Sequence, residues 1–151
     1  MQSFNIPSED AMLELGHSWA GCIGGGAVVF LDGDLGAGKT TLARGILRGM
    51  GHRGAVTSPT YTLVEHYAPG GRDIYHFDLY RLEDPAELEM TGLRDFLDGC
   101  SILLVEWPQR GAGRMPLPDF YIDIRYHGDA RRVRIDGGVP GTGVTHRPRP
   151  C

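Results

Sequence analysis

The sequence predicts an α/β fold in which helices flank a mixed sheet of parallel and antiparallel strands. Two continuous apolar runs, residues 27–31 and 102–105, have the composition of buried parallel strands. The first run leads through a glycine-rich loop into residues 41–50, where apolar side chains recur at helical spacing. Residues 120–126 and 132–135 alternate apolar and polar side chains, as partly exposed strands do. The order of strand, glycine-rich loop and helix indicates a P-loop NTPase-like fold.

Local sequence signals predict the other elements. Ser8 precedes two acidic residues and an amphipathic run, which predicts a capped helix that ends at the glycines 24–26. Residues 61–67 have strand propensity, and after a Pro-Gly-Gly turn residues 73–79 return as the second strand of a hairpin. Asp84, followed at once by a proline and three positions on by a glutamate, predicts another helix start.

The length and net charge of the chain limit how many domains it can form and which partners it can bind. We expect residues 1–136 to form a single P-loop ATPase domain and residues 137–151, rich in Gly, Pro, Thr and Arg, to be a disordered tail. The net charge of −4 argues against a broad nucleic-acid surface, so any role in RNA metabolism would go through partners. We find no signal peptide and no membrane-spanning run, and expect a cytoplasmic protein that is monomeric in isolation.

The run GDLGAGKTT at residues 33–41 fits the phosphate-binding pattern G-x-x-x-x-G-K-[ST]. Lys39 is the only lysine of the chain, and the other fourteen basic side chains are arginines. A compact ammonium on a flexible stem fits between phosphates where a planar guanidinium does not. The Thr40 hydroxyl is predicted to bind Mg²⁺. The predicted nucleotide-binding residues of the loop are Asp34, Leu35, Gly36, Ala37, Gly38, Lys39, Thr40 and Thr41.

Two acidic residues are candidates for the rest of the site. Glu106 follows the buried run 102–105, and a carboxylate at that strand end would hold Mg²⁺ directly or through water. The alternative is a solvated glutamate at a strand terminus. Asp78 shares a strand face with His76 and is a candidate for the outer shell of Mg²⁺ or for orienting water. His76 is interpreted either as a proton shuttle or as a structural histidine.

The segment Ser58-Pro59-Thr60 lies where nucleotide-sensing switch loops usually sit, between the P-loop helix and the predicted hairpin. Thr60 is therefore a candidate contact to the metal or the γ-phosphate, with an ordinary turn as the alternative. No arginine precedes Lys39 in the P-loop or lies in this segment. Arg81 is the nearest candidate, and we expect it to point away from the site if the strand through Asp78 continues that far.

ATP is favoured over GTP as the nucleotide. The chain has a single asparagine and no second lysine, so it lacks the N-K-x-D segment of guanine-specific P-loop proteins. A small-molecule kinase is an alternative, with Arg110 and Arg114 as lid arginines. However, the segment around them, QRGAGRMPLP, has no helical lid pattern.

Several longer motifs occur in collinear order over residues 6–135: GDLGAGKTT, SPTYTLVE, HFDLYRL, DPAELE with a following GLRDFL, VEWPQR and LPDFYIDI. In these motifs the sequence resembles the TsaE (formerly YjeE) family, small bacterial P-loop ATPases of the pathway that makes threonylcarbamoyladenosine in tRNA. The resemblance implies a P-loop core with additional antiparallel strands. The tail from Gly137 has no counterpart in this resemblance.

The resemblance also implies an activity and a partner. It implies a slow, Mg²⁺-dependent ATPase that works with the TsaB–TsaD heterodimer on tRNAs reading codons that begin with adenine. Such a subunit does not transfer the threonylcarbamoyl group itself, and tRNA is reached through the complex. A nucleotide-gated adaptor with incidental hydrolysis, or a free kinase, is the alternative.

The resemblance assigns roles to individual residues. Lys39, Thr40 and Thr41 bind phosphates, and Thr40 and Glu106 lie at Mg²⁺. Asp78 and Trp107 are required for turnover, and Thr60 belongs to the switch. The remaining two implied contacts to the nucleotide are Glu9 and Arg131.

Overall fold

The computed structural model describes residues 1–59 and 61–137. Thr60 and residues 138–151 lie outside the described residues, and so do the switch contact predicted for Thr60 and almost all of the predicted tail. Gly137, which the sequence places in that tail, is the last residue of strand β7 (Ala130–Gly137). Within the described residues, no helix is both long and apolar enough to cross a membrane.

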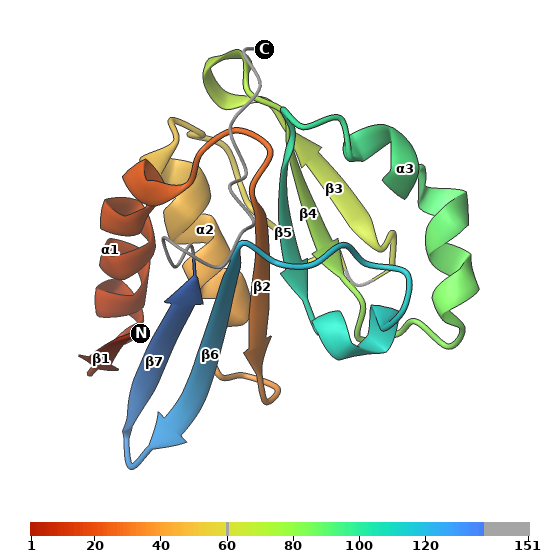
Figure 1. Ribbon diagram of the computed structural model, residues 1–151. Helices are drawn as coiled ribbons and strands as arrows, with labels where there is room; N and C mark the ends of the chain where they lie inside the picture. Colours follow the sequence, from red (N-terminus) through yellow and green to blue (C-terminus); the bar gives the residue numbers. More distant parts are fainter. Residues whose placement is uncertain (60, 138–151) are drawn as a thin grey trace.

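The described strands form one sheet in the order β1-β7-β6-β2-β5-β4-β3 (Figure 1). Its centre is parallel, because β2 pairs in parallel with β5 and β6, and β5 pairs in parallel with β4. Antiparallel pairs of β3 with β4, β6 with β7 and β7 with β1 extend both sides. The predicted mixed sheet is confirmed. The other strand bounds are β1 (Gln2–Ile6), β2 (Val28–Gly33), β3 (Val64–Tyr67), β4 (Ile74–Asp78), β5 (Ile102–Glu106) and β6 (Phe120–His127).

Two strands differ from the prediction. The hairpin of β3 and β4 is present, but β3 begins at Val64 rather than at residue 61. Leu63 has a φ of 67°, in the left-handed region, which interrupts an extended strand just before Val64. Strand β1 was not predicted, because its five residues are mostly exposed and carry little apolar pattern. It forms by pairing with β7 along the full length of β1.

Two helices, α1 (Glu9–Trp19) and α2 (Lys39–Gly49), pack against each other and cover one face of the sheet (Figure 1). The predicted cap of α1 is present, because the Ser8 hydroxyl accepts a hydrogen bond from the Ala11 amide. The α-helix ends at Trp19, earlier than the predicted glycines, and a 3₁₀ turn, η1 (Ala20–Cys22), follows.

The opposite face is covered by short helical segments. They are η3 (Pro85–Thr91), α3 (Leu93–Phe96) and η4 (Pro108–Gly111), and a further turn, η2 (Pro69–Gly71), joins β3 to β4. Asp84 caps η3 as predicted, since its carboxylate accepts from the Ala86 amide, although the segment is a 3₁₀ helix. Alternation along β5 divides the core: Leu103 and Val105 face this layer, and Ile102 and Leu104 face α1 and α2.

The carboxyl ends of β2, β4 and β5 meet at one edge of the sheet, because these strands are parallel. The P-loop follows β2, Asp78 ends β4, and Glu106 ends β5 with Trp107 directly after it. In open α/β sheets this edge is where ligands bind.

Candidate active site

The P-loop joins the end of β2 to the start of α2. Gly36 and Gly38 have φ values of 76° and 116°, which side-chain-bearing residues rarely adopt. Gly38 is also the N-cap of α2, so the loop ends at a helix N-terminus, where backbone N–H groups attract anions. The local sequence therefore supplies the glycines and the helix start that the predicted phosphate-binding loop needs, and the Tyr126 hydroxyl of β6 donates to the Leu35 carbonyl of the loop at 2.8 Å.

Lys39 is buried, with 4% of its surface exposed. Its Nζ donates hydrogen bonds to the Gly33 carbonyl at 2.6 Å and the Asp34 carbonyl at 2.8 Å. Burial lowers the pKa of Lys39, and the nearby carboxylates of Glu106 and Asp78 oppose that shift. These contacts hold a compact cation at the centre of the loop.

Trp107 closes the site over Lys39. It follows β5 directly with φ 57° and ψ 51°, a left-handed conformation that is uncommon for a residue with a large side chain. The Lys39 Nζ lies 4.5 Å from the centroid of the indole ring, and the Tyr80 ring lies 5.0 Å from it. The strained turn after β5 thus places the indole ring of Trp107 against the ammonium group of Lys39.

Glu106 ends β5 as predicted and is 2% exposed. The Thr40 hydroxyl donates to its carboxylate and lies 3.0 Å from both oxygens. The other close partner is His76 on β4, whose Nε2 lies 2.6 Å from Oε2 of Glu106. Glu106 is therefore a buried carboxylate held between the P-loop helix and the neighbouring strand, and the solvated terminus considered from the sequence is wrong.

Asp78 lies beside Glu106, its register partner in the parallel pair of β4 and β5. Its Oδ2 accepts a hydrogen bond from the Ser58 hydroxyl at 2.6 Å, and its Oδ1 accepts from the Tyr80 amide at 3.1 Å. The segment predicted as a switch is therefore connected to the end of β4 through Ser58. His76 and Asp78 share a face of the strand, as the sequence predicts.

A cavity of about 410 Å³ lies in front of the P-loop. Most of the predicted site residues line it: Leu35, Gly36, Gly38, Lys39, Thr40, Thr41, Asp78, Glu106 and Trp107. Arg81 also lines it, whereas the sequence predicted that this side chain points away if the strand through Asp78 continued that far. Strand β4 ends at Asp78, so the alternation assumed for Arg81 does not apply. Its guanidinium lies 4.6 Å from the centroid of the Tyr61 ring.

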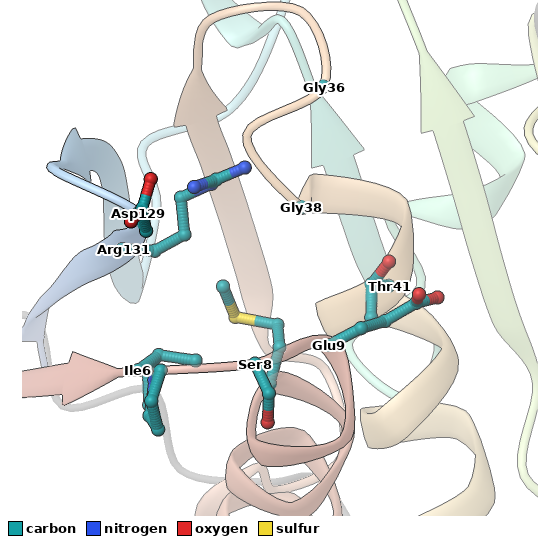
Figure 2. Close-up of a pocket in the computed structure, with 10 residues that line it drawn as sticks. Ile6, Ser8, Glu9, Gly36, Gly38, Thr41, Asp129 and Arg131 are labelled. Carbon is teal, nitrogen blue, oxygen red and sulfur yellow. The ribbon is translucent and has the colours of Figure 1, made fainter.

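A second cavity of about 280 Å³ lies on the other side of the loop and shares Gly36, Gly38 and Thr41 with the first. Figure 2 shows the Glu9 carboxylate beside Thr41, and Arg131 reaching across from β7 toward the glycines of the loop. The structure thus brings Glu9 and Arg131, at opposite ends of the chain, to the same cavity. Glu9 also lies 3.8 Å from Arg44.

Two of the predicted residues that the structure describes line neither cavity. Asp34 contributes its backbone carbonyl to Lys39, and Ala37 is 1% exposed and packs in the core under the loop. Sequence reasoning missed Tyr80 and Asp129, which line the first and the second cavity respectively. Tyr80 lies within the HFDLYR motif, which is a usable signal, whereas nothing in the local sequence marks Asp129.

Residues 6–134 match the family model described as TsaE, threonylcarbamoyl adenosine biosynthesis protein. The tRNA threonylcarbamoyladenosine biosynthesis protein TsaE of Haemophilus influenzae is 50% identical over 135 residues, which cover 86% of this chain and 85% of that protein. The Streptomyces coelicolor protein of the same name is 40% identical over 134 residues, or 87% and 82% of the two chains.

Among solved structures, the crystal structure of Bacillus subtilis YdiB matches with a TM-score of 0.73 at 28% identity, and the match covers 87% of this chain and 82% of that one. The region matched by the family model begins at the last residue of β1 and ends within β7, so it includes the P-loop and the ends of β4 and β5. The resemblance inferred from the motifs is confirmed: the chain belongs to the TsaE family of tRNA threonylcarbamoyladenosine biosynthesis.

Proposed function

We propose that the chain is the Mg²⁺-dependent ATPase subunit of a tRNA-modifying complex. It hydrolyses ATP slowly by itself, acts with the TsaB–TsaD heterodimer, and supports threonylcarbamoyladenosine formation in tRNAs that read codons beginning with adenine. It works in the cytoplasm and does not transfer the threonylcarbamoyl group. Family membership supports the pathway, and the P-loop cavity supports the nucleotide chemistry.

One observation carries the proposal: the Thr40 hydroxyl lies 3.0 Å from both carboxylate oxygens of Glu106. A P-loop hydroxyl and a strand-end carboxylate at this separation are the oxygen donors that Mg²⁺ prefers, and Asp78 supplies a second carboxylate next to them. These residues fit the ion. Mg²⁺ at these oxygens would offset negative charge on the nucleotide phosphates.

The chain's own groups have separate tasks in this proposal. The amides of Gly36, Gly38 and Lys39 bind phosphate oxygens, and the Lys39 ammonium exchanges its two carbonyl partners for the phosphates. Trp107 covers the ammonium and keeps water from that side. Asp78, joined to Ser58, orients the attacking water. Thr60 is proposed to contact the metal or the γ-phosphate.

The second cavity is proposed to take the ribose and adenine. It shares the P-loop glycines with the first cavity, and the apolar side chain of Met12 is part of its lining. Glu9 and Arg131 face it from α1 and β7 (Figure 2) and offer one acceptor and one donor group to the nucleoside. A nucleotide bound in this orientation spans both cavities with its phosphates on the loop.

Glu106→Gln tests the proposal. The amide keeps the shape of the carboxylate but loses its charge, so the variant should bind ATP and hydrolyse it at least roughly 10-fold more slowly, the lower bound for disturbing a metal site. Phosphate release at saturating Mg²⁺-ATP measures this. The matched control is Glu83→Gln, which removes an exposed carboxylate. An unchanged rate in the Glu106 variant would rule out the proposed metal site.

Product analysis separates the ATPase from the two alternatives. Release of orthophosphate alone identifies an ATPase, and a phosphorylated small molecule identifies a kinase. Arg114, a lid arginine in the kinase hypothesis, lies 3.4 Å from Glu89 and does not line the cavity. The adaptor hypothesis predicts that the reconstituted complex modifies tRNA repeatedly with a non-hydrolysable ATP analogue, whereas the ATPase proposal predicts that it requires ATP.

A further inference from the structure

His76 is the most deeply buried ionisable side chain near the site, with no exposed surface. Its Nε2 lies 2.6 Å from Glu106 Oε2. Its other ring nitrogen, Nδ1, is buried and has no hydrogen-bond partner among the residues that the structure describes. One side of the ring therefore makes a short polar contact, and the other is left unsatisfied.

An unsatisfied buried nitrogen destabilises a fold, so packing by itself does not explain a histidine at this position. Its neighbours on β4 that face the core, Ile74 and Phe77, are apolar and fully buried. A leucine would fill a similar volume without an unpaired polar atom. Unlike leucine, the histidine provides a polar contact between its Nε2 and the carboxylate of Glu106.

The contact completes a chain of three residues from three elements. Thr40 on α2 donates to Glu106 on β5, and His76 on β4 contacts the same carboxylate from the adjacent strand. A carboxylate that is held from two sides cannot rotate freely. Groups that orient metal-binding side chains in this way control metal affinity and activity.

We infer that His76 is a positioning residue for the catalytic carboxylate: Nε2–H donates to Glu106 Oε2 and fixes the orientation in which Glu106 and Thr40 face the nucleotide-bound metal. The inference rests on the function proposed above. It assigns His76 no contact with ATP and no proton transfer to or from substrate. The proton shuttle considered from the sequence is thereby replaced by a fixed hydrogen-bond donor.

The test compares two amide substitutions. In His76→Gln the amide nitrogen reaches the place of Nε2 and can still donate to Glu106. In His76→Asn the shorter side chain places its amide near the position of Nδ1, away from the carboxylate. The two variants differ by one methylene, and both replace the ring with an amide, so they separate the hydrogen bond from the loss of the imidazole.

We expect His76→Asn to lower kcat for ATP hydrolysis by roughly 10- to 100-fold, the usual effect of losing an orienting partner, with little change in KM. His76→Gln should restore most of kcat. A second readout does not need turnover: binding of a fluorescent ATP analogue is measured in EDTA and in Mg²⁺. The Asn variant should match wild type in EDTA and lose the gain in affinity that Mg²⁺ confers.

Three outcomes overturn the inference. One is wild-type kcat and Mg²⁺ response in His76→Asn. Another is equal loss in Asn and Gln variants with equal loss of thermal stability, which means a structural role. The third is an absent Mg²⁺ response in wild type, which refutes the proposed function itself. If His76→Asn does not fold, His76→Leu, which removes the donor and fills the apolar space, takes its place with the same expectations.

Discussion

The ammonium group of Lys39 is closely surrounded by other groups of the protein. Two backbone carbonyls accept from its ammonium within 2.8 Å, and the Trp107 ring lies 4.5 Å away on another side. Its side chain is buried, while the arginines on α2, Arg44 and Arg48, are more accessible. A site of this size accepts a point charge on a thin stem. It has no room for a planar guanidinium with five donors.

Lys39→Arg should therefore abolish ATP binding although it conserves the charge. Titration with a fluorescent ATP analogue measures the affinity. Arg48→Lys is the matched control, because it makes the reverse exchange on an exposed surface of the same helix and should bind as wild type does. Wild-type affinity in the Lys39 variant would contradict the argument from the shape of the site.

The packing of α1 against α2 sets the position of the P-loop, because α2 begins at Lys39. The two helices approach closely along a row of glycines, Gly16, Gly45 and Gly49. A Cβ at Gly45 would lie 2.4 Å from the Leu13 carbonyl oxygen, and one at Gly16 would lie 2.6 Å from the Leu42 carbonyl oxygen. These are backbone atoms and cannot rotate out of the way, so an added methyl group forces the helices apart.

Gly45→Ala should lower the free energy of unfolding by about 1–3 kcal/mol, the usual cost of overpacking, despite the higher helix propensity of alanine. For a chain of this size each kcal/mol corresponds to roughly 2–4 °C in Tm, which thermal denaturation resolves. The control is Gly21→Ala, because a Cβ there would meet nothing within 4 Å. Equal Tm values for the two variants would show that the helices can separate without cost.

At the scale of the whole molecule, Arg81 bears on whether the proposed hydrolysis requires a partner. It lines the P-loop cavity, so the argument that no arginine is near the phosphates does not hold. However, its guanidinium stacks on Tyr61, which is 85% exposed. An exposed ring gives the pair little packing against the rest of the described chain. Leu35 of the P-loop is also exposed beside the cavity. A bound partner would order these groups.

We therefore expect slow phosphate release by the isolated chain and faster release with the TsaB–TsaD heterodimer at fixed Mg²⁺-ATP. An arginine placed against the γ-phosphate contributes roughly 10³–10⁵ in rate, which bounds the possible stimulation. Arg81→Ala distinguishes the source: lost stimulation means that the partner orders Arg81, and retained stimulation means that the partner supplies the charge. Full-speed hydrolysis by the isolated chain, without response to the heterodimer, would contradict the proposed coupling.

The sequence by itself determined the features that depend on neighbouring residues. The P-loop needs only its glycines, Lys39 and a helix start, and Glu106 needs only a buried strand before it. Asp78 was also a candidate from the sequence, but its place beside Glu106 depends on the parallel pairing of β4 with β5. The central strands of the sheet were predicted for the same reason, because they carry strong local patterns, whereas the additional antiparallel strands were implied by the family resemblance.

Only the tertiary structure decided the features that depend on pairing between distant segments. The bond from His76 to Glu106 requires the register of β4 against β5, which a short apolar strand does not encode locally. The place of Arg81 depends on β4 ending at Asp78. Glu9 and Arg131, named from family resemblance and not from spacing, face one cavity because the fold brings the start of α1 and the start of β7 to the same side of the P-loop. Local chemistry specifies the loop, whereas long-range packing determines which side chains surround it.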